Sequence, residues 1–225
     1  MKKLTFPKAV GDVLEHAGFV KVEKDRWRRE IGDYVDQIFT YLSRDFKEIA
    51  VDIHVEDRIT QDIICEATTD PLWTSRFPID IPLPWLEGKG NWWPRGDPDG
   101  PTKLAEAVRS LVLPFLHGLH SLEGMRAYLE KTAPNRWHKE ARLSLAVTLS
   151  RLGEHDKALE ILNDSMPMAW RRTPHFQRVE NLKGWVTERK TAGVVSESPS
   201  GRPLTLDCDP SSLAIFLAMG AIGLG

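Results

Sequence analysis

The sequence predicts an α+β protein: an antiparallel sheet of about four strands with helices packed on one face, followed by an all-α helical-hairpin extension. Three observations carry this prediction. An amphipathic segment near the start ends at a glycine, two later runs alternate apolar and polar residues, and the second half has helical periodicity. Hydrophobic residues make up 41% of the 225 residues, enough to bury a sizeable core.

The first helix is expected over Phe6–Ala17, because its apolar residues recur at helical spacing and Gly18 follows where helices often end. Trp27–Ile31 is predicted as a short strand, and a Gly-Asp turn leads into a second strand, Tyr34–Ser43. Short links between strands favour an antiparallel meander.

Glu48–Glu56 gives the clearest strand signal. The residues expected to face the core are Ile49, Val51, Ile53 and Val55, and those expected to face away are Ala50, Asp52, His54 and Glu56. Gln61–Ala67 is predicted as a fourth strand.

Prolines and glycines punctuate residues 68–101, but five large aromatic residues there predict an ordered loop packed on the sheet. A helix is expected from Thr102 to about His117, with Pro114 kinking or ending it. Ser121 is the expected cap of a short helix that runs to Lys131.

Three further helices are predicted in the second half, over Trp137–Leu152, Glu154–Ser165 and Thr173–Arg189. We therefore expect an α+β domain over residues 1–132, a helical extension over 133–190, and a flexible stretch with an apolar tail over 191–225. The tail Leu213–Gly225 is too short to span a bilayer. It can pack on its own protein, insert into a partner, or be an artefact of the reading frame's end.

A cytoplasmic location is expected. Cys65 and Cys208 lie far apart in unlike contexts, which is typical of free thiols in a reducing compartment. The first residues lack the apolar core of a signal peptide, and no stretch is long and apolar enough to predict a membrane span.

Catalytic motifs are sparse. His117 and His120 have metal-ligand spacing, but a third ligand is not evident, and two histidines at a helix end explain them. Asp52, His54 and Glu56 share one strand face, where an acid/base pair or a solvated partner-facing surface are the alternatives. The sequence has no Cys-x-x-Cys, no Gly-x-Ser-x-Gly and no glycine loop between a strand and a helix, so no cofactor is predicted.

The charge pattern points to a protein partner. Residues 30–70 hold 11 acidic against 3 basic residues, a net of −8, and residues 136–190 carry a net of +4. An acidic sheet attracts a basic partner and repels nucleic acid. Trp92 and Trp93 are adjacent indoles that cannot easily both face one core. The predicted partner-binding residues are Asp33, Asp36, Asp52, Glu56, Trp92 and Trp93.

Several short motifs together resemble the DUF4304 family of uncharacterised bacterial domains over residues 6–131. The motifs are Ala17-Gly18-Phe19, Trp27-Arg28-Arg29, Asn91-Trp92-Trp93, Leu113-Pro114-Phe115-Leu116 and Ser121-Leu122-Glu123-Gly124-Met125. The family has no assigned catalytic residue, so none is transferred. Its members are similar to small proteins from toxin-antitoxin and secretion neighbourhoods, which implies an immunity or adaptor role.

The second half is similar to one tetratricopeptide helix pair. The residues that carry this similarity are Leu145, Ala146, Leu149, Gly153, Ala158 and Leu162. A solenoid needs about three such repeats, so the hairpin is expected to dock on the N-terminal domain or on another chain.

The first functional expectation is a non-enzymatic immunity protein that occludes a cognate toxin, with a basic toxin domain as partner. The second is an adaptor that holds a peptide in the helical hairpin, where Arg142, Arg171 and Arg172 would contribute. The third is an enzyme that acts through Asp52, His54 and Glu56.

Overall fold

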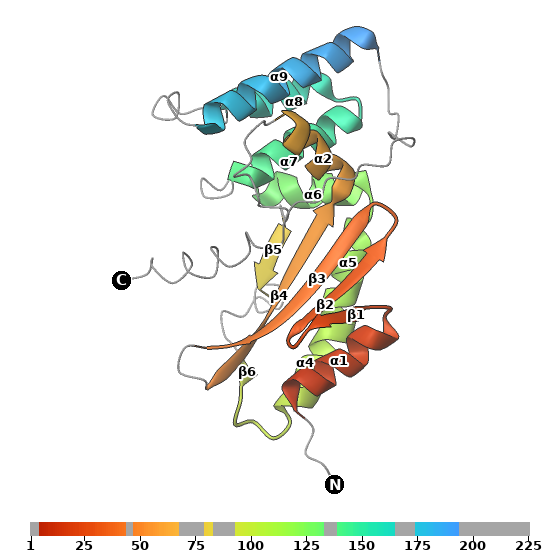
Figure 1. Ribbon diagram of the computed structural model, residues 1–225, viewed down its shortest axis with the longest axis vertical. Helices are drawn as coiled ribbons and strands as arrows, with labels where there is room; N and C mark the ends of the chain where they lie inside the picture. Colours follow the sequence, from red (N-terminus) through yellow and green to blue (C-terminus); the bar gives the residue numbers. More distant parts are fainter. Residues whose placement is uncertain are drawn as a thin grey trace, which may run out of the picture.

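The computed structural model describes residues 5–43, 47–67, 79–82, 93–132, 139–164 and 174–193. An antiparallel sheet with strand order β1-β2-β3-β4-β5 forms its centre, and a short β6 also pairs with β4 (Figure 1). The strands are β1 (Val20–Glu23), β2 (Arg26–Ile31), β3 (Tyr34–Leu42), β4 (Glu48–Asp57), β5 (Ile79–Pro82) and β6 (Trp93–Pro94). The predicted α+β class and antiparallel meander are confirmed.

The predicted fourth strand over Gln61–Ala67 is wrong, because this segment belongs to a helix, α2 (Arg58–Ala67). A side-chain oxygen of Asp57 accepts a hydrogen bond from the backbone N–H of Thr60 (3.2 Å), which caps the first turn. Thr60, Gln61 and Ile64 are buried at helical spacing, whereas the short apolar run taken alone is compatible with either element. The sequence pattern does not predict β5, which pairs with β4.

Helix α1 (Phe6–His16) packs against the sheet and ends where the sequence predicts. Gly18 takes the left-handed conformation (φ +85°), and the N–H of Phe19 returns to the carbonyl of Leu14 (3.0 Å). Gly11 faces the buried indole of Trp27, and a Cβ there would lie 3.3 Å from the ring. The absent side chain therefore lets helix and strand approach closely.

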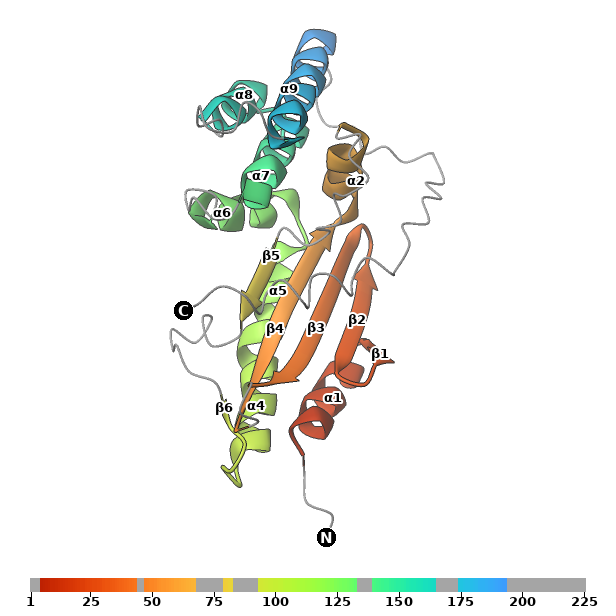
Figure 2. The same cartoon turned by 60° about the vertical axis from the view of Figure 1, so that its left-hand side comes forward.

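A long helical rod runs along the same face of the sheet (Figure 2). It consists of α4 (Gly100–Ala107), a π-helical turn η1 (Val108–Val112) and α5 (Leu113–Leu119). Of the two alternatives predicted for Pro114, kinking or ending the helix, the second is wrong, because α5 continues to Leu119. The π turn lies directly before the proline, and its wider ring lets the chain continue although Pro114 cannot donate a hydrogen bond.

The remaining helices form a bundle at one end of the sheet: α6 (Leu122–Thr132), α7 (Lys139–Arg151), α8 (His155–Asp164) and α9 (Pro174–Ala192). Helix α7 lies in its middle, because all residues from Leu143 to Ser150 are buried. The predicted helices of the second half are confirmed within their described residues.

The helical extension shares its core with the sheet. Helix α2, which follows β4 directly, packs against α7 and α9, and one hydrophobic cluster extends from Phe6 to Val186. A boundary between residues 132 and 133 therefore does not separate two cores.

Several predictions concern residues outside the described ranges: the loop packed on the sheet, apart from β5 and β6, the tail Leu213–Gly225, and Cys208. Among the described helices, none combines the length and the apolarity needed to cross a membrane.

Candidate functional site

The candidate site is the outer face of the sheet, opposite the face that packs on α1 and the α4–α5 rod (Figures 1 and 2). The strand register arranges its side chains in rows that cross the sheet. Three rows contain one residue from each of β2, β3 and β4: Arg26, Phe39 and Asp52 in the first, Arg28, Gln37 and His54 in the second, and Glu30, Val35 and Glu56 in the third. Tyr41 of β3 stands beside Ala50 of β4. The predicted separation of the two faces of β4 is confirmed by the burial of its four apolar residues.

Ring and ion contacts join neighbouring side chains of the outer face. The guanidinium of Arg26 lies 5.0 Å from the centre of the Phe39 ring, and the rings of Phe39 and His54 are 4.7 Å apart. The hydroxyl of Tyr41 donates a hydrogen bond to Asp52 (3.0 Å). The face is therefore a stack of aromatic and charged groups around two buried residues, Val35 and Gln37.

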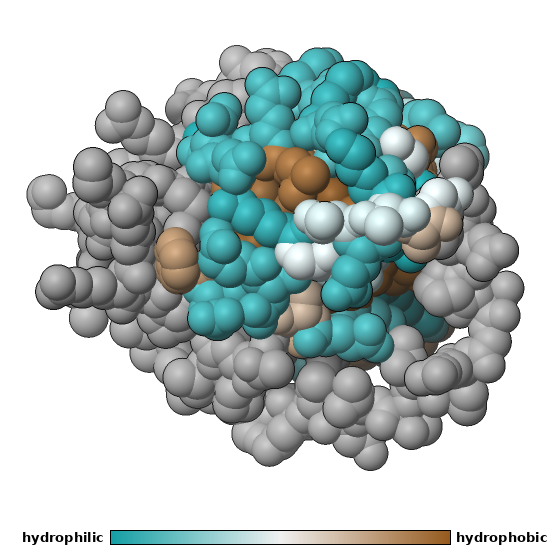
Figure 3. All heavy atoms as spheres, turned by 90° about the horizontal axis from the view of Figure 1, so that it is seen from above, coloured by the Kyte–Doolittle hydropathy of each residue, from teal (hydrophilic) through white to brown (hydrophobic). Residues whose placement is uncertain are grey.

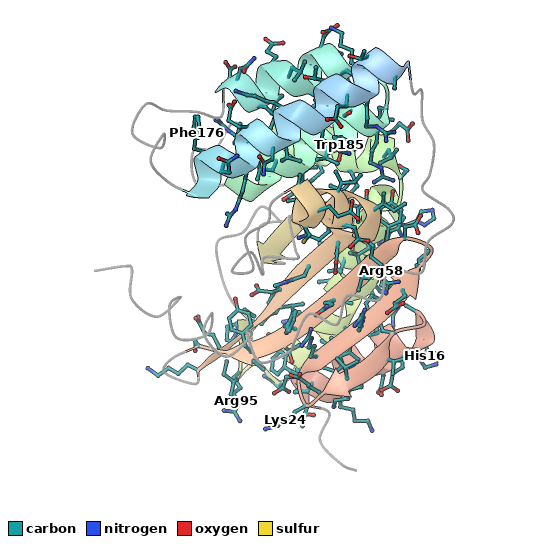
Figure 4. All side chains as sticks on the ribbon, turned by 45° about the horizontal axis from the view of Figure 1, so that its top comes forward. His16, Lys24, Arg58, Arg95, Phe176 and Trp185 are labelled. Carbon is teal, nitrogen blue, oxygen red and sulfur yellow. The ribbon has the colours of Figure 1, made fainter. Side chains whose placement is uncertain are left out.

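At the end of the sheet nearest the bundle, two arginines bind one carboxylate. The carboxylate of Glu30 forms ion pairs with the guanidinium groups of Arg28 (2.7 Å) and Arg58 (2.5 Å). The hydrogen bond from Arg58 is the main cause of the lowered pKa of Glu30. Figure 4 shows Arg58 at this end, close to the helices.

The outer face is not uniformly acidic, which corrects the expectation drawn from residues 30–70. Arg26 and Arg28 precede that segment in sequence but share its face in the sheet. Two of the segment's acids, Asp36 and Asp57, lie on the core face, because each stands an even number of positions from a core residue of its strand. The face therefore carries both signs of charge.

Asp36 cannot contact a partner, so its assignment as a binding residue is wrong. Its side chain is 1% exposed, and it accepts hydrogen bonds from Arg29 (3.1 and 2.7 Å) and pairs with Nε2 of His120 (2.9 Å). Arg29 also donates to the carbonyl of Ala17 at the end of α1 (3.0 Å). Asp36 therefore ties α1, two strands and α5 together, and His120 has a structural role.

Asp57 makes a second buried link, from the sheet to the bundle. Its carboxylate pairs with Arg151 at the end of α7, and Arg151 also donates to the hydroxyl of Thr60 (2.9 Å). Burial, together with the charge of Asp57, raises the pKa of Tyr34 to about 12.

The other predicted binding residues have mixed locations. Asp33 is exposed in the turn between β2 and β3. Trp93 is half-buried in β6, beside Ile49, and packs against the core. Trp92 lies outside the described residues. Asp52 and Glu56 are half-buried on the outer face, as expected from the alternation of β4.

The three residues of the enzyme hypothesis stand in a line along β4. Successive Cα atoms on one face of a strand are about 6.8 Å apart, so Asp52, His54 and Glu56 project in parallel. Within the described ranges, no group of three or more His, Cys, Asp or Glu side chains is arranged to hold a metal ion.

Two open grooves lie away from the outer face. One, of about 530 Å³, lies between α1 and the α4–α5 rod and is lined by Asp12, His16, Glu106 and Arg109 among others. The other, of about 440 Å³, lies between α2 and α9 and includes Glu66, Trp185 and Glu188. The second groove has no local signal in the sequence, because its two walls are more than a hundred residues apart.

Comparisons with known proteins yield no relative. No protein-family model matches the chain, and no curated protein and no solved structure matches it. The resemblances to DUF4304 and to a tetratricopeptide pair therefore stay predictions.

Proposed function

We propose that this protein is a non-catalytic protein-binding module that docks through the outer face of its sheet. The composition of that face supports the proposal. Aromatic residues and arginine are enriched in the centres of protein interfaces, and here Phe39, Tyr41, Arg26 and Arg28 lie on neighbouring strands.

Exposed apolar side chains border the same surface. Val20, which is 67% exposed, stands opposite Arg28 at the edge of the sheet, and Tyr41 is 37% exposed at the end of β3. A partner that covers these side chains would gain from their removal from water. This combination of exposed apolar groups and a charged, aromatic stack is the single observation that carries the proposal.

The first role proposed for the module is that of an immunity protein of bacteria, which acts in the cytoplasm and blocks a toxin by occlusion. This role is supported by the resemblance of residues 6–131 to DUF4304. Because the outer face carries both signs of charge, we expect the association rate to fall only modestly with added salt, in contrast to a wholly acidic face.

The test is co-expression of this chain with the proteins encoded beside its gene, scored by growth and by a binding titration with the purified pair. Tyr41→Ala and Arg28→Ala should each weaken binding by about tenfold or more if they are central contacts. Arg109→Ala is the matched control, because Arg109 is also an exposed arginine paired with a glutamate, but it lies on the α4–α5 rod.

Two results would count against the proposal in different ways. Neutralisation that survives both sheet substitutions would exclude the outer face as the binding surface. If the wild-type chain relieves growth inhibition but does not bind the toxic protein, occlusion is excluded as the mechanism.

A further inference from the structure

The groove between α2 and α9 is the second surface with a definite chemical character. Its lining residues are Glu66, Ala67, Glu180, Asn181, Gly184, Trp185 and Glu188. Figure 4 shows Trp185 at the helical end of the molecule, far from the labelled residues His16, Lys24 and Arg95 at the opposite end of the sheet. The groove is distinct from the outer face, because none of its lining residues belongs to the rows of that face.

The groove is electronegative for two separate reasons. Among the described residues, the exposed carboxylates of Glu66 and Glu188 have no ion-pair partner, whereas Glu180 is paired with Lys183 at 2.8 Å. The carboxyl end of α2 also lies in its wall, because Asn181 donates a hydrogen bond to the carbonyl of Ala67 (2.6 Å). The last carbonyls of a helix carry a partial negative charge that adds to the two carboxylates.

An indole stands among these negative groups. Trp185 is half-buried, and the guanidinium of the chain's own Arg189 lies 5.0 Å from its ring centre. The ring therefore already has a guanidinium on one side, and cation–π attraction favours arginine over neutral side chains at such a ring.

Gly184 gives an independent indication that the groove is kept open. It lies in the interior of the 19-residue helix α9, where glycine costs stability relative to alanine. Packing does not require it, because a Cβ at this position would meet nothing within 4 Å. It borders the groove beside Trp185, where any side chain would narrow the space.

We propose that the groove between α2 and α9 binds an arginine-bearing basic segment of a partner protein. A guanidinium stacks on Trp185 and pairs with Glu66 or Glu188, and the remaining carboxylate holds a neighbouring basic residue. The described surface of this end of the molecule is mainly hydrophilic (Figure 3), which favours a charged, extended segment over an apolar helix. This binding is independent of the outer face.

The test is fluorescence anisotropy of the full chain with labelled peptides of alternating arginine and glycine, and of alternating glutamate and glycine. Wild type should bind the arginine peptide and not the glutamate peptide. Glu66→Gln combined with Glu188→Gln should weaken binding by about tenfold or more. Glu15→Gln combined with Glu160→Gln is the control, because it removes the same charge from exposed positions on α1 and α8.

Gly184→Ala separates binding from folding. It should raise Tm by about 2–4 °C, because alanine has a better helix propensity than glycine, and it should also weaken binding of the arginine peptide. A folding defect could not explain this loss of affinity. Equal losses in the two paired glutamate variants would overturn the proposal, since they would mean attraction by net charge alone. Unchanged binding in Gly184→Ala and Trp185→Leu would also overturn it. Tyr41→Ala should leave this binding intact, so the outcome is independent of the outer face.

Discussion

Removal of the buried carboxylate of Asp57 should be the most damaging single change at the junction of sheet and bundle. Asp57 is 1% exposed and its partner Arg151 has a side chain that is 13% exposed. Loss of one partner of a buried ion pair costs about 3 kcal/mol at the lower end of the observed range. We use this lower value because the side chain of Arg151 stays in partial contact with water. Loss of the cap on α2 adds about 1 kcal/mol.

Asp57→Ala should therefore lower the free energy of unfolding by about 4 kcal/mol. Asp57→Asn should lower it by about 1 kcal/mol less, because asparagine is an equally good cap but carries no charge. With a denaturant dependence of about 2 kcal/mol per molar urea, the midpoint of Asp57→Ala should fall by about 2 M. Urea unfolding followed by far-ultraviolet circular dichroism measures both.

A double-mutant cycle isolates the pair. Arg151→Met alone leaves the carboxylate of Asp57 buried without its cation, so Asp57→Asn combined with Arg151→Met should cost less than the sum of the two single changes by about 2 kcal/mol. Additivity within about 0.5 kcal/mol, or a cost below about 1 kcal/mol for Asp57→Ala, would refute the view that this ion pair joins sheet and bundle.

Three further predictions concern buried positions. Asp36→Ala should destabilise the fold by about 3 kcal/mol in urea unfolding, because Arg29 stays buried without its partner, and it should not remove a partner contact directly. Tyr34 has a folded pKa of about 12 against 10.0 for an isolated tyrosine, so stability should be lost as pH rises from 10 towards 12. Tyr34→Phe should lessen this loss in unfolding measured across that range. Gly124→Ala should destabilise by several kcal/mol, since its Cβ would lie 1.8 Å from the carbonyl oxygen of Gly118, whereas Gly118→Ala meets nothing within 4 Å and should be tolerated in thermal unfolding.

The local pattern of the sequence was sufficient to predict the elements with clear periodicity. Strand β4 has strict alternation and helix α1 is followed by a glycine stop. The bounds of both elements lie within a residue or so of the predicted ones. The strand predicted after β4 is wrong, because a short apolar run fits strand and helix equally and the cap that Asp57 supplies to α2 decides for the helix.

The candidate site depends on information that is not local. The charge counted along residues 30–70 predicts an acidic face, but pleating sends Asp36 to the core. Strand pairing also places Arg26 and Arg28 on the same face as Asp52 and His54, with β3 between them. Alternation along β3 is sufficient to place Asp36 on the core face, since it lies an even number of positions from the core residue Ile38. The groove between α2 and α9 could not have been found without the tertiary structure.

The position of α2 has an evolutionary consequence. This helix is encoded between two strands but completes the bundle, where it packs against α7 and α9. A shortened chain of residues 1–132 would expose the apolar sides of α2 and α6 to water. An isolated C-terminal hairpin would lack the packing of α2 and α6 on α7. Gene shuffling could therefore not transplant either half alone, and lineages that inherit this protein should gain or lose both halves together.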